Sequence, residues 1–512
     1  MTKNMRSGLV WKMWIGLFAG LFFFSCGGNS TPKLTSISLS KGSLSPSFDP
    51  DVFTYNVSLS FLEAASTLTA QSQDGGDMVS VDGQTAKASQ DSKSIVTTLA
   101  ETETIHVTVE NAKGDQTTYQ IHFLRSANQK KLSKSSPTTE DYFGRAVSIH
   151  ENDLAVGVSG NDSNGKIDNG AVYVYKKDSS GNWGSPQIIV PSDLQSMEYA
   201  GVSVSLYGDY LAVGVYNHSS GGKTNNGAVY VYKKDSSGIW GNEKKITAFD
   251  ADDNDQFGGR VSMYENRIAI SAVGENSNAG AVYLYLRDGS DNWGSEQKLT
   301  ASDFSTNDFF GSWVEMNGDY LAIGSLFDDD NGADSGSVYV YKVNGMGVWG
   351  SEQKLTASDG AADDRFGTCV GLKGDRLVVG APNNDDKGTD SGSVYVYTRQ
   401  SGSGIWSSEQ KIVSDDGQGF DQFGFAVVLG DDFLAVSATG DDDKASSGGI
   451  IFVYTMDTTN DFVNPTKLFP DSLGADDFFG GSMSIDGSSL VAGSQSDTAT
   501  TDTGSVFTFS LE

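Results

Sequence analysis

The feature that most constrains the fold of this 512-residue chain is a unit of 53 to 57 residues that recurs between residues 126 and 512. Each unit begins with an aromatic residue followed by glycine, and an aliphatic residue opens an apolar segment eleven positions after the aromatic one. This offset never varies, so the units are copies of one supersecondary structure. The seven pairs, of which Ala200-Gly201 is the one degenerate copy, start at residues 143, 200, 257, 310, 366, 423 and 479.

Each unit carries the signals of four short strands. In the third segment, for example SVYVY at residues 337–341, both strand faces are apolar, which is typical of a strand buried on both sides. An aromatic residue six positions before an aliphatic one announces a fourth strand. Four strands per unit predict a blade, and the chain is therefore expected to fold as an all-β protein with a seven-bladed β-propeller. The aromatic residues that announce the fourth strands are Trp183, Trp240, Trp293, Trp349, Trp406 and Phe462.

The last unit ends at Glu512 without a fourth strand. Residues 129–133 (QKKLS) precede the first unit. Their Leu132 lies eleven positions before Phe143, and in the other units the aliphatic residue of the fourth strand lies eleven positions before the start of the next unit. We therefore predict that this N-terminal strand completes the last blade and closes the ring, which removes exposed sheet edges.

One unit, EQKLTASDGAADDRFGTCVGLKGDRLVVGAPNNDDKGTDSGSVYVY at residues 352–397, resembles the bacterial FG-GAP repeat, which is related to the propeller of integrin α-subunits. The resemblance covers about three quarters of the chain and implies an extracytoplasmic binding or adhesion protein. Integrin-type repeats place a DxDxDG calcium loop between the first two strands. This chain has only tight turns there, such as NGD at residues 317–319, so those calcium sites are not expected.

Residues 34–125 have a different pattern, in which apolar and polar residues alternate, as in Tyr55, Val57 and Leu59. A period of two predicts half-buried strands, and about 90 residues of them fit a small antiparallel β-sandwich. The segments LTSISLSKGSLSPSFDPDVFTYNVSLS and TIHVTVENAKGDQTTYQIHFLR resemble the cadherin-like β-sandwich domain of bacterial surface proteins. That resemblance implies a non-catalytic spacer or adhesion module.

The N-terminus has the pattern of an export signal. Three cationic residues precede the apolar run at residues 13–24 (MWIGLFAGLFFF), which is shorter than the ~20 residues of a membrane-spanning helix. Ser25-Cys26-Gly27 resembles the lipobox of bacterial lipoproteins, although Phe23 and Phe24 depart from its preferred residues. The resemblance implies a signal peptide at residues 1–25, a lipid on Cys26 and a tether at residues 26–33.

A lipidated Cys26 would anchor the protein to a membrane without spanning it. The predicted location is therefore the cell envelope. Gly27 after the cysteine favours the outer membrane under enterobacterial sorting rules. The sequence leaves open whether the protein faces the medium or the periplasm.

The charge balance excludes some partners and suggests one cofactor. With 66 acidic and 35 basic residues the net charge is −31, which argues against nucleic-acid binding. Many of these acids lie in loops that a propeller would bring to one face. They are either solvated turn residues or ligands for calcium, which prefers carboxylate oxygens. The candidate calcium ligands are Asp328, Asp330, Asp334, Asp385, Asp386, Asp441 and Asp443.

Few signals indicate an enzyme, because four histidines in the whole chain leave little for a Ser-His-Asp or zinc site. We therefore expect a non-catalytic, monomeric binding or adhesion platform whose ligand is a protein or a glycan. One alternative is a polysaccharide hydrolase that uses loop carboxylates such as Asp328, Asp330, Asp385 and Asp386. The other is an assembly scaffold in the periplasm.

Overall fold

The computed structural model describes residues 31–61, 63, 65–96, 102–125, 127–496 and 502–511. The predicted signal peptide and Cys26 lie outside these residues. Within them, no helix has the length and apolar character needed to cross a membrane. The chain divides into two compact units, one built mainly from the residues before Phe123 and the other from Phe123 onward.

The first unit contains two β-sheets with the strand orders β1-β4-β7 and β2-β3-β9-β8-β5-β6. In β3 every second residue is buried, which confirms the alternation seen in the sequence. Buried Tyr119 donates a hydrogen bond from its hydroxyl to the Pro50 carbonyl oxygen at 3.0 Å and so fixes a loop at the end of the sandwich. The strands are β1 (Leu34–Leu39), β2 (Leu44–Ser45), β3 (Thr54–Leu59), β4 (Ala65–Ser72), β5 (Met78–Val81), β6 (Lys87–Ala88), β7 (Gln90–Val96), β8 (Thr102–Glu110) and β9 (Gln116–Arg125).

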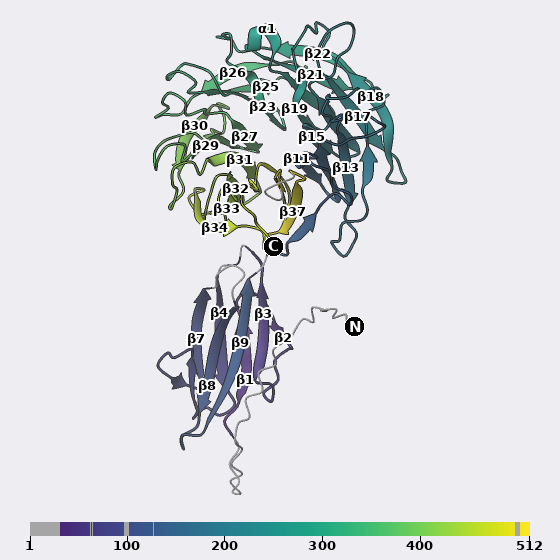
Figure 1. Ribbon diagram of the computed structural model, residues 1–512. Coiled ribbons are helices and arrows are strands. Elements are labelled where there is room, and N and C mark those ends of the chain that lie inside the picture. The colour runs from purple at the N-terminus through teal and green to yellow at the C-terminus, as the bar shows by residue number, and fades with distance from the viewer. Residues whose placement is uncertain are drawn as a thin grey trace, which may run out of the picture. The chain divides into compact units, whose positions relative to one another are not determined.

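The second unit is a β-propeller with seven four-stranded antiparallel sheets in its described residues. We number the sheets from first (β11 to β14) to seventh (β35, β36, β37 and β10) in chain order. The innermost strands surround the centre of the ring (Figure 1), and each contacts the innermost strand of the next sheet. These strands are β11 (Phe143–His150), β15 (Ser203–Tyr207), β19 (Phe257–Tyr264), β23 (Phe310–Asn317), β27 (Cys369–Lys373), β31 (Phe423–Leu429) and β35 (Ser482–Asp486).

The second and third strands of each sheet are the most completely buried. The second strands are β12 (Asp153–Val158), β16 (Tyr210–Val215), β20 (Arg267–Ala272), β24 (Tyr320–Ser325), β28 (Arg376–Ala381), β32 (Phe433–Ala438) and β36 (Ser489–Ser494). The third strands are β13 (Ala171–Lys176), β17 (Ala228–Lys234), β21 (Ala281–Arg287), β25 (Ser337–Val343), β29 (Ser393–Arg399), β33 (Ile450–Met456) and β37 (Ser505–Ser510). A four-residue helix, α1 (Glu275–Asn278), lies between β20 and β21.

The outer strands confirm most of the predicted fourth strands. Five of them begin at the predicted aromatic residue, but in the first sheet the strand begins four residues after Trp183. The seventh sheet is completed by β10, whose Lys131 pairs with Phe507, so the predicted closure by an N-terminal strand is confirmed. The outer strands are β14 (Gln187–Ile189), β18 (Trp240–Ile246), β22 (Trp293–Leu299), β26 (Trp349–Leu355), β30 (Trp406–Ile412), β34 (Phe462–Leu468) and β10 (Lys130–Leu132).

The recurring aromatic-glycine pair holds neighbouring sheets together. Phe366 is fully buried and packs edge-on against Tyr395 of its own sheet, with ring centroids 5.4 Å apart. Gly367 has φ of 93°, and a Cβ there would lie 2.5 Å from the carbonyl oxygen of Ser337 in the preceding sheet. Only glycine permits this backbone conformation and this close approach.

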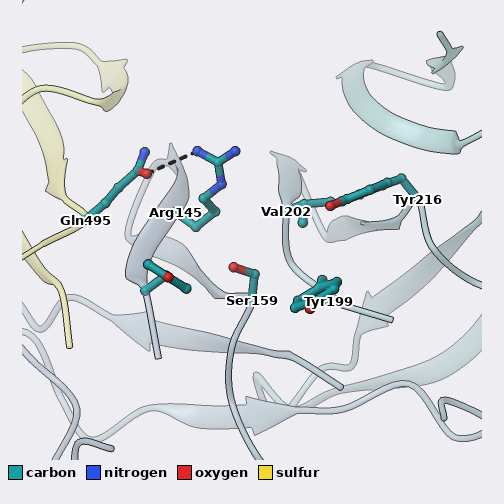
Figure 2. A pocket seen from close by; sticks show the side chains of 7 residues that line it. Arg145, Ser159, Tyr199, Val202, Tyr216 and Gln495 are labelled. Atoms are coloured by element: carbon teal, nitrogen blue, oxygen red, sulfur yellow. Dashed lines mark hydrogen bonds between the residues drawn. The ribbon is translucent and has the colours of Figure 1, made fainter. Parts of the chain in front are cut away.

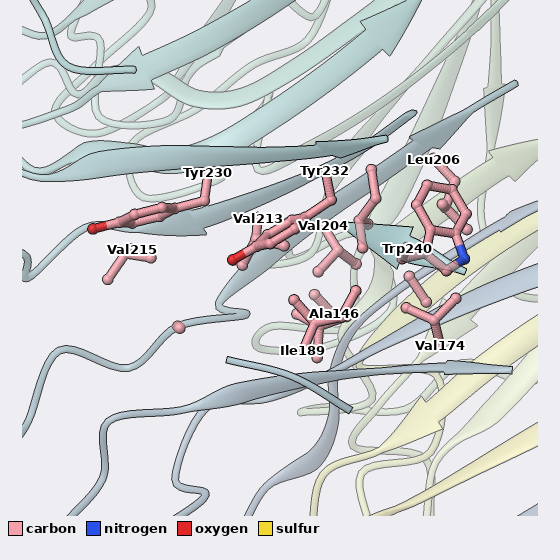
Figure 3. Close-up of a cluster of buried hydrophobic side chains, with 14 of the residues drawn as sticks. Ala146, Val174, Ile189, Val204, Leu206, Val213, Val215, Tyr230, Tyr232 and Trp240 are labelled. Carbon is pink, nitrogen blue, oxygen red and sulfur yellow. The ribbon is translucent and has the colours of Figure 1, made fainter. Parts of the chain in front are cut away.

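The degenerate copy is compensated by a nearby leucine. Ala200 stands where the other units have an aromatic residue, and it belongs to the core between the first and second sheets. Figure 3 shows this core, with Val174 and Ile189 of the first sheet beside Tyr230 and Tyr232 of the second. Leu194 belongs to the same core and is 1% exposed, whereas Phe304 at the same place in the fourth sheet is 57% exposed. Leu194 therefore supplies apolar volume that the missing aromatic ring would otherwise fill.

Candidate functional site

The acidic loops converge on lysine residues. In the fourth sheet Lys354 is paired directly with Tyr339 across β25 and β26. Its Nζ lies 2.7 Å from Asp303 Oδ2, 2.9 Å from Asp328 Oδ2 and 2.6 Å from Asp330 Oδ2. The Tyr339 hydroxyl donates hydrogen bonds to Asp303 at 2.7 Å and to Asp328 at 2.9 Å. We call this arrangement of a lysine, its facing aromatic residue and their carboxylates a lysine-carboxylate cluster.

The lysine-carboxylate cluster recurs in the second to sixth sheets. In each, the aspartate comes from the loop that leaves the outer strand of the preceding sheet, so the cluster joins two sheets. A tyrosine faces the lysine in the second to fifth sheets, and Phe452 takes its place in the sixth. The lysine-aspartate pairs are Lys245–Asp193, Lys298–Asp250, Lys354–Asp303, Lys411–Asp359 and Lys467–Asp416.

The charges within a cluster stabilise one another. Burial lowers the pKa of Lys354, but hydrogen bonds to its three aspartates outweigh burial, so the pKa is raised. Burial raises the pKa of Asp303, but the bonds from Lys354 and Tyr339 outweigh it and lower the pKa. Lys354 and Asp303 are therefore both charged at neutral pH, and each is committed to bonds within the cluster.

One buried position after the second strand changes its chemistry from sheet to sheet. The third residue after each second strand is Asn161, His218, Glu275, Asp328, Asn384 or Asp441 in the first six sheets, and each is buried. In the second sheet, His218 Nδ1 lies 3.0 Å from Glu198 Oε2 and His218 Nε2 lies 2.6 Å from Lys245 Nζ. Burial raises the pKa of Asp441 to about 6, and Phe452 has no hydroxyl to donate to it.

The structure does not bring the seven predicted calcium ligands together. Asp328 and Asp330 bind Lys354. Asp386 binds Lys411 at 2.5 Å, and Asp443 binds Lys467 at the same distance. In the described parts of the chain, no group of three or more His, Cys, Asp or Glu side chains is placed to hold a metal ion. Calcium binding stays a prediction, and the ammonium groups provide the cations that balance these carboxylates.

Asp334 and Asp385 serve in loop turns instead. Asp385 Oδ1 accepts a hydrogen bond from the Asp390 backbone N–H at 2.9 Å. Asp334 has φ of 53°, and its carbonyl oxygen accepts a bond of 3.2 Å from the Arg365 backbone N–H. Both support the interpretation of these residues as turn-formers.

A second set of acids is buried, which the sequence did not predict. Two residues before each aromatic-glycine pair, a buried carboxylate accepts the backbone N–H three residues before it, as Asp364 does from Ala361 at 2.9 Å. The constant spacing of an acid before the pair was the available signal. The set consists of Asp141, Glu198, Asp255, Asp308, Asp364, Asp421 and Asp477.

Among its described residues, the first sheet lacks the lysine-carboxylate cluster. Its Tyr173 faces Ile188 instead of a lysine, and Ser136 stands seven residues before Phe143, where the clustered sheets have aspartate. Near this sheet the propeller has a pocket of about 270 Å³. It is lined by Tyr142, Arg145, Ser159, Tyr199, Val202, Tyr216 and Gln495, from the first, second and seventh sheets.

The pocket has two chemically different ends (Figure 2). Arg145 and Gln495 lie at one end, joined by a hydrogen bond of 3.1 Å from Arg145 Nη1 to Gln495 Oε1. Tyr199 and Tyr216 lie at the other end, and Ser159 lies between the two. The pocket thus combines a cation with aromatic faces.

Two of the tyrosines that line the pocket, Tyr142 and Tyr199, have an uncommon backbone conformation. Tyr142 has φ of 52° and Tyr199 has φ of 58°, values that residues other than glycine rarely adopt. Backbone bonds from Tyr142 N to Asp502 O at 3.2 Å and from Tyr199 N to Asp168 O at 3.1 Å hold them. Burial and the charge of Asp168 and Glu140 raise the pKa of Tyr199, so its hydroxyl keeps its proton.

Comparison with known proteins identifies the repeats and the sandwich. A model of the FG-GAP repeat matches residues 127–175, 183–232, 240–285, 293–341, 349–397 and 406–454, and a model of the cadherin-like beta sandwich domain matches residues 34–126. A periplasmic gluconolactonase of Pseudomonas aeruginosa has a TM-score of 0.39 and 16% sequence identity. The alignment covers 73% of this chain and 94% of that one. No curated protein matches.

Proposed function

The chain belongs to the FG-GAP repeat family, with a cadherin-like β-sandwich ahead of the repeats. From this, and from the lipobox-like pattern at Cys26, we propose that it is a lipid-anchored envelope protein whose propeller is a non-catalytic binding platform. The pocket beside the first sheet is the proposed binding site. The sandwich would act as a spacer between the lipid on Cys26 and the propeller.

The observation that carries this proposal is the contrast between committed and uncommitted polar groups. In the lysine-carboxylate clusters the charged groups bind one another, as Lys354 does with Asp303, Asp328 and Asp330. Six of the seven residues that line the pocket have a hydrogen-bonding side chain, Val202 being the exception. Such a pocket, with polar groups placed around aromatic faces, is suited to holding a ligand.

The same contrast favours binding over hydrolysis. A glycosidase needs two carboxyl groups that are free to exchange protons on either side of the scissile bond. Of the candidate residues, Asp328, Asp330 and Asp386 bind lysines, and Asp385 accepts a backbone N–H. These bonds support a structural role for the four aspartates.

Two measurements on cells test the anchor and the exposure of the platform. Palmitate labelling of the protein should be lost in Cys26→Ala. Antibodies against the propeller should label intact cells, with a periplasmic protein as a control that is labelled only after permeabilisation. A protein that takes up no lipid, or one found in the cytoplasm, would overturn the proposal. Labelling only after permeabilisation would direct the search for a ligand to the periplasm.

A further inference from the structure

The pocket beside the first sheet contains hydrogen-bonding groups that no described part of the protein uses. The hydroxyls of Tyr142, Tyr199 and Tyr216 and the Ser159 Oγ have no hydrogen-bond partner among the described residues. In the fourth-sheet cluster, by contrast, the Tyr339 hydroxyl donates to Asp303 and Asp328. Unused donors and acceptors in a pocket are available to a ligand.

A guanidinium group without a carboxylate partner marks one end of the pocket. In the described part of a chain with 66 acidic residues, Arg145 forms no ion pair, and its one side-chain hydrogen bond goes to neutral Gln495. At least one edge of its guanidinium is free to donate. A planar guanidinium matches a carboxylate in a two-bond geometry, so this end favours an anionic group.

A second arginine strengthens the positive potential here. Arg260 on β19 donates from Nε to the Ser312 carbonyl oxygen at 3.2 Å and lies 4.4 Å from the centre of the Trp313 ring. It likewise forms no ion pair with any described residue. Burial and repulsion from Arg145 lower the pKa of Arg260 to about 10. The two guanidinium groups therefore favour an anion at the Arg145 end of the pocket, whereas Asp168 and Glu140 place negative charge near the tyrosine end.

The other end of the pocket favours a hydroxyl-rich ring. Aromatic side chains pack against the apolar C–H face of a small ring and leave their hydroxyls free to bind polar substituents. The volume of about 270 Å³ lies just below the range of roughly 300–1,000 Å³ that suits drug-sized ligands. One ring therefore fits the pocket better than an extended chain.

We infer that this pocket binds a uronate, a pyranose ring that carries a carboxylate, as a single residue of an acidic glycan. The carboxylate lies against Arg145 and Gln495, and the ring packs on Tyr199 and Tyr216. Ser159 and the tyrosine hydroxyls bind the ring hydroxyls. This inference rests on the proposed function, because it names the ligand of the same binding platform.

Calorimetric titration of the purified full chain tests the ligand class. D-glucuronate should bind about tenfold more tightly than D-glucose or methyl glucuronate, since only the uronate offers a carboxylate to Arg145. It should also bind about tenfold more tightly than acetate, which has no ring. Glucose binding as tightly as glucuronate would overturn the inference, as would acetate binding as tightly, or the absence of any glucuronate binding. N-acetyl-glutamate binding more tightly would assign the pocket to an acidic peptide instead.

Variants test the two ends separately. Arg145→Gln should weaken glucuronate binding about tenfold and leave it equal to glucose binding. The double variant Tyr199→Ala with Tyr216→Ala should weaken the binding of both glucuronate and glucose. Phe309→Ala and Arg365→Gln are controls, because Phe309 and Arg365 stand directly before an aromatic-glycine pair, as Tyr199 stands before Ala200, and neither lines the pocket. An unchanged urea midpoint shows that each variant is folded, and unchanged glucuronate binding by folded Arg145→Gln would refute the assignment.

The outcome is separable from that of the proposed function. If glucuronate fails to bind while Cys26 is lipidated and antibodies label intact cells, the uronate assignment falls and the binding platform stands. If glucuronate binds but the protein takes up no lipid, the pocket stands and the anchored location falls.

Discussion

The fourth and first sheets of the propeller share one strand order, but the tyrosine at the equivalent position of the third strand has different partners in the two sheets. In the fourth sheet, Tyr339 faces Lys354 and donates to two aspartates, so the tyrosine hydroxyl has partners in the cluster. In the first sheet, Tyr173 faces Ile188, and its hydroxyl lies 3.5 Å from Asn161. In the nearby pocket, the hydroxyls of Tyr142, Tyr199 and Tyr216 and the Ser159 Oγ have no hydrogen-bond partner among the described residues.

The difference teaches where a repeat protein can place function. A repeat that follows its rule uses polar side chains to attach one sheet to the next, which fixes the ring. Where the rule lapses, as at Ala200 and Ile188, other residues must restore the packing, and the loops can present groups to a ligand. Changes that break a cluster, or build one, therefore test the comparison directly.

Breaking the fourth-sheet cluster should have the largest effect. Lys354→Met leaves three carboxylates without their cation, and Asp328 among them is 5% exposed. We expect a loss of about 3 kcal/mol in the free energy of unfolding. Urea unfolding followed by tryptophan fluorescence measures it, because the described tryptophans all lie in the propeller. Lys387→Met is the control, since Lys387 is exposed; an equal loss there would refute the role of the cluster.

Removing the compensating leucine should destabilise the second sheet. Leu194→Ala opens a cavity beside Ala200 in a core with no aromatic residue at that place, at a cost of about 3 kcal/mol. Phe304→Ala removes the residue at the same place in the fourth sheet, where it is 57% exposed, and should cost less than about 1 kcal/mol. The urea midpoints of the two variants decide the point. Equal shifts would show that Leu194 does not replace the aromatic ring.

The sixth sheet should show a pH-dependent weakness. The folded pKa of Asp441 is raised to about 6, above the ~3.9 of an unfolded aspartate, so folding retains a proton that unfolding releases. Stability should therefore fall as the pH rises from about 4 to about 6. Asp441→Asn, which copies the natural Asn384 of the fifth sheet, should remove roughly 2 kcal/mol of this dependence.

Unfolding midpoints at pH 4.5 and 7.5 measure the effect of Asp441→Asn. Asp432→Asn, at an exposed position, is the control and should follow the wild-type pH profile. If Asp441→Asn also follows that profile, Asp441 is ionised in the folded protein at low pH and the explanation is wrong.

Building the missing cluster into the first sheet should have the smallest effect. Ile188→Lys with Ser136→Asp places a lysine opposite Tyr173 and an aspartate at the usual position in the preceding loop. A gain of about 1 kcal/mol is expected, because the new pair is partly exposed: Ile188 is 54% exposed. Thermal unfolding measures this gain, with each single variant as a control. A double variant no more stable than the sum of its singles would show that the lysine and aspartate do not interact.

Much of the fold could be predicted because repetition supplies its own alignment. The offset between the aromatic-glycine pair and the second strand located the strands, and Leu132 identified the strand that closes the ring. The short β14 was not foreseen, because Trp183 forms only an isolated bridge with Lys177 and the paired segment begins at Gln187. A side chain marks a strand in the sequence, but the backbone pairing sets where the strand begins.

The candidate site could be predicted only in part. The sequence indicated that two classes of acidic loop share one face, and the structure places both on the same lysines. It did not indicate those lysines as partners, because Lys354 lies 51 residues from Asp303 along the chain. The pocket was not foreseen, since Arg145, Tyr199 and Gln495 come from three units and carry no common motif.

The sequence alone determined the period of the repeat, the four strands in each unit and the N-terminal closing strand. These follow from local alternation, turn residues and fixed offsets, which act over a few residues at a time. The tertiary structure decided which carboxylates pair with lysines and which polar groups remain free, because the distance between side chains of different sheets is set by how the ring packs. It also made Asp441 a buried acid and Asp330 an exposed one, although both lie in aspartate-rich loops of the same class.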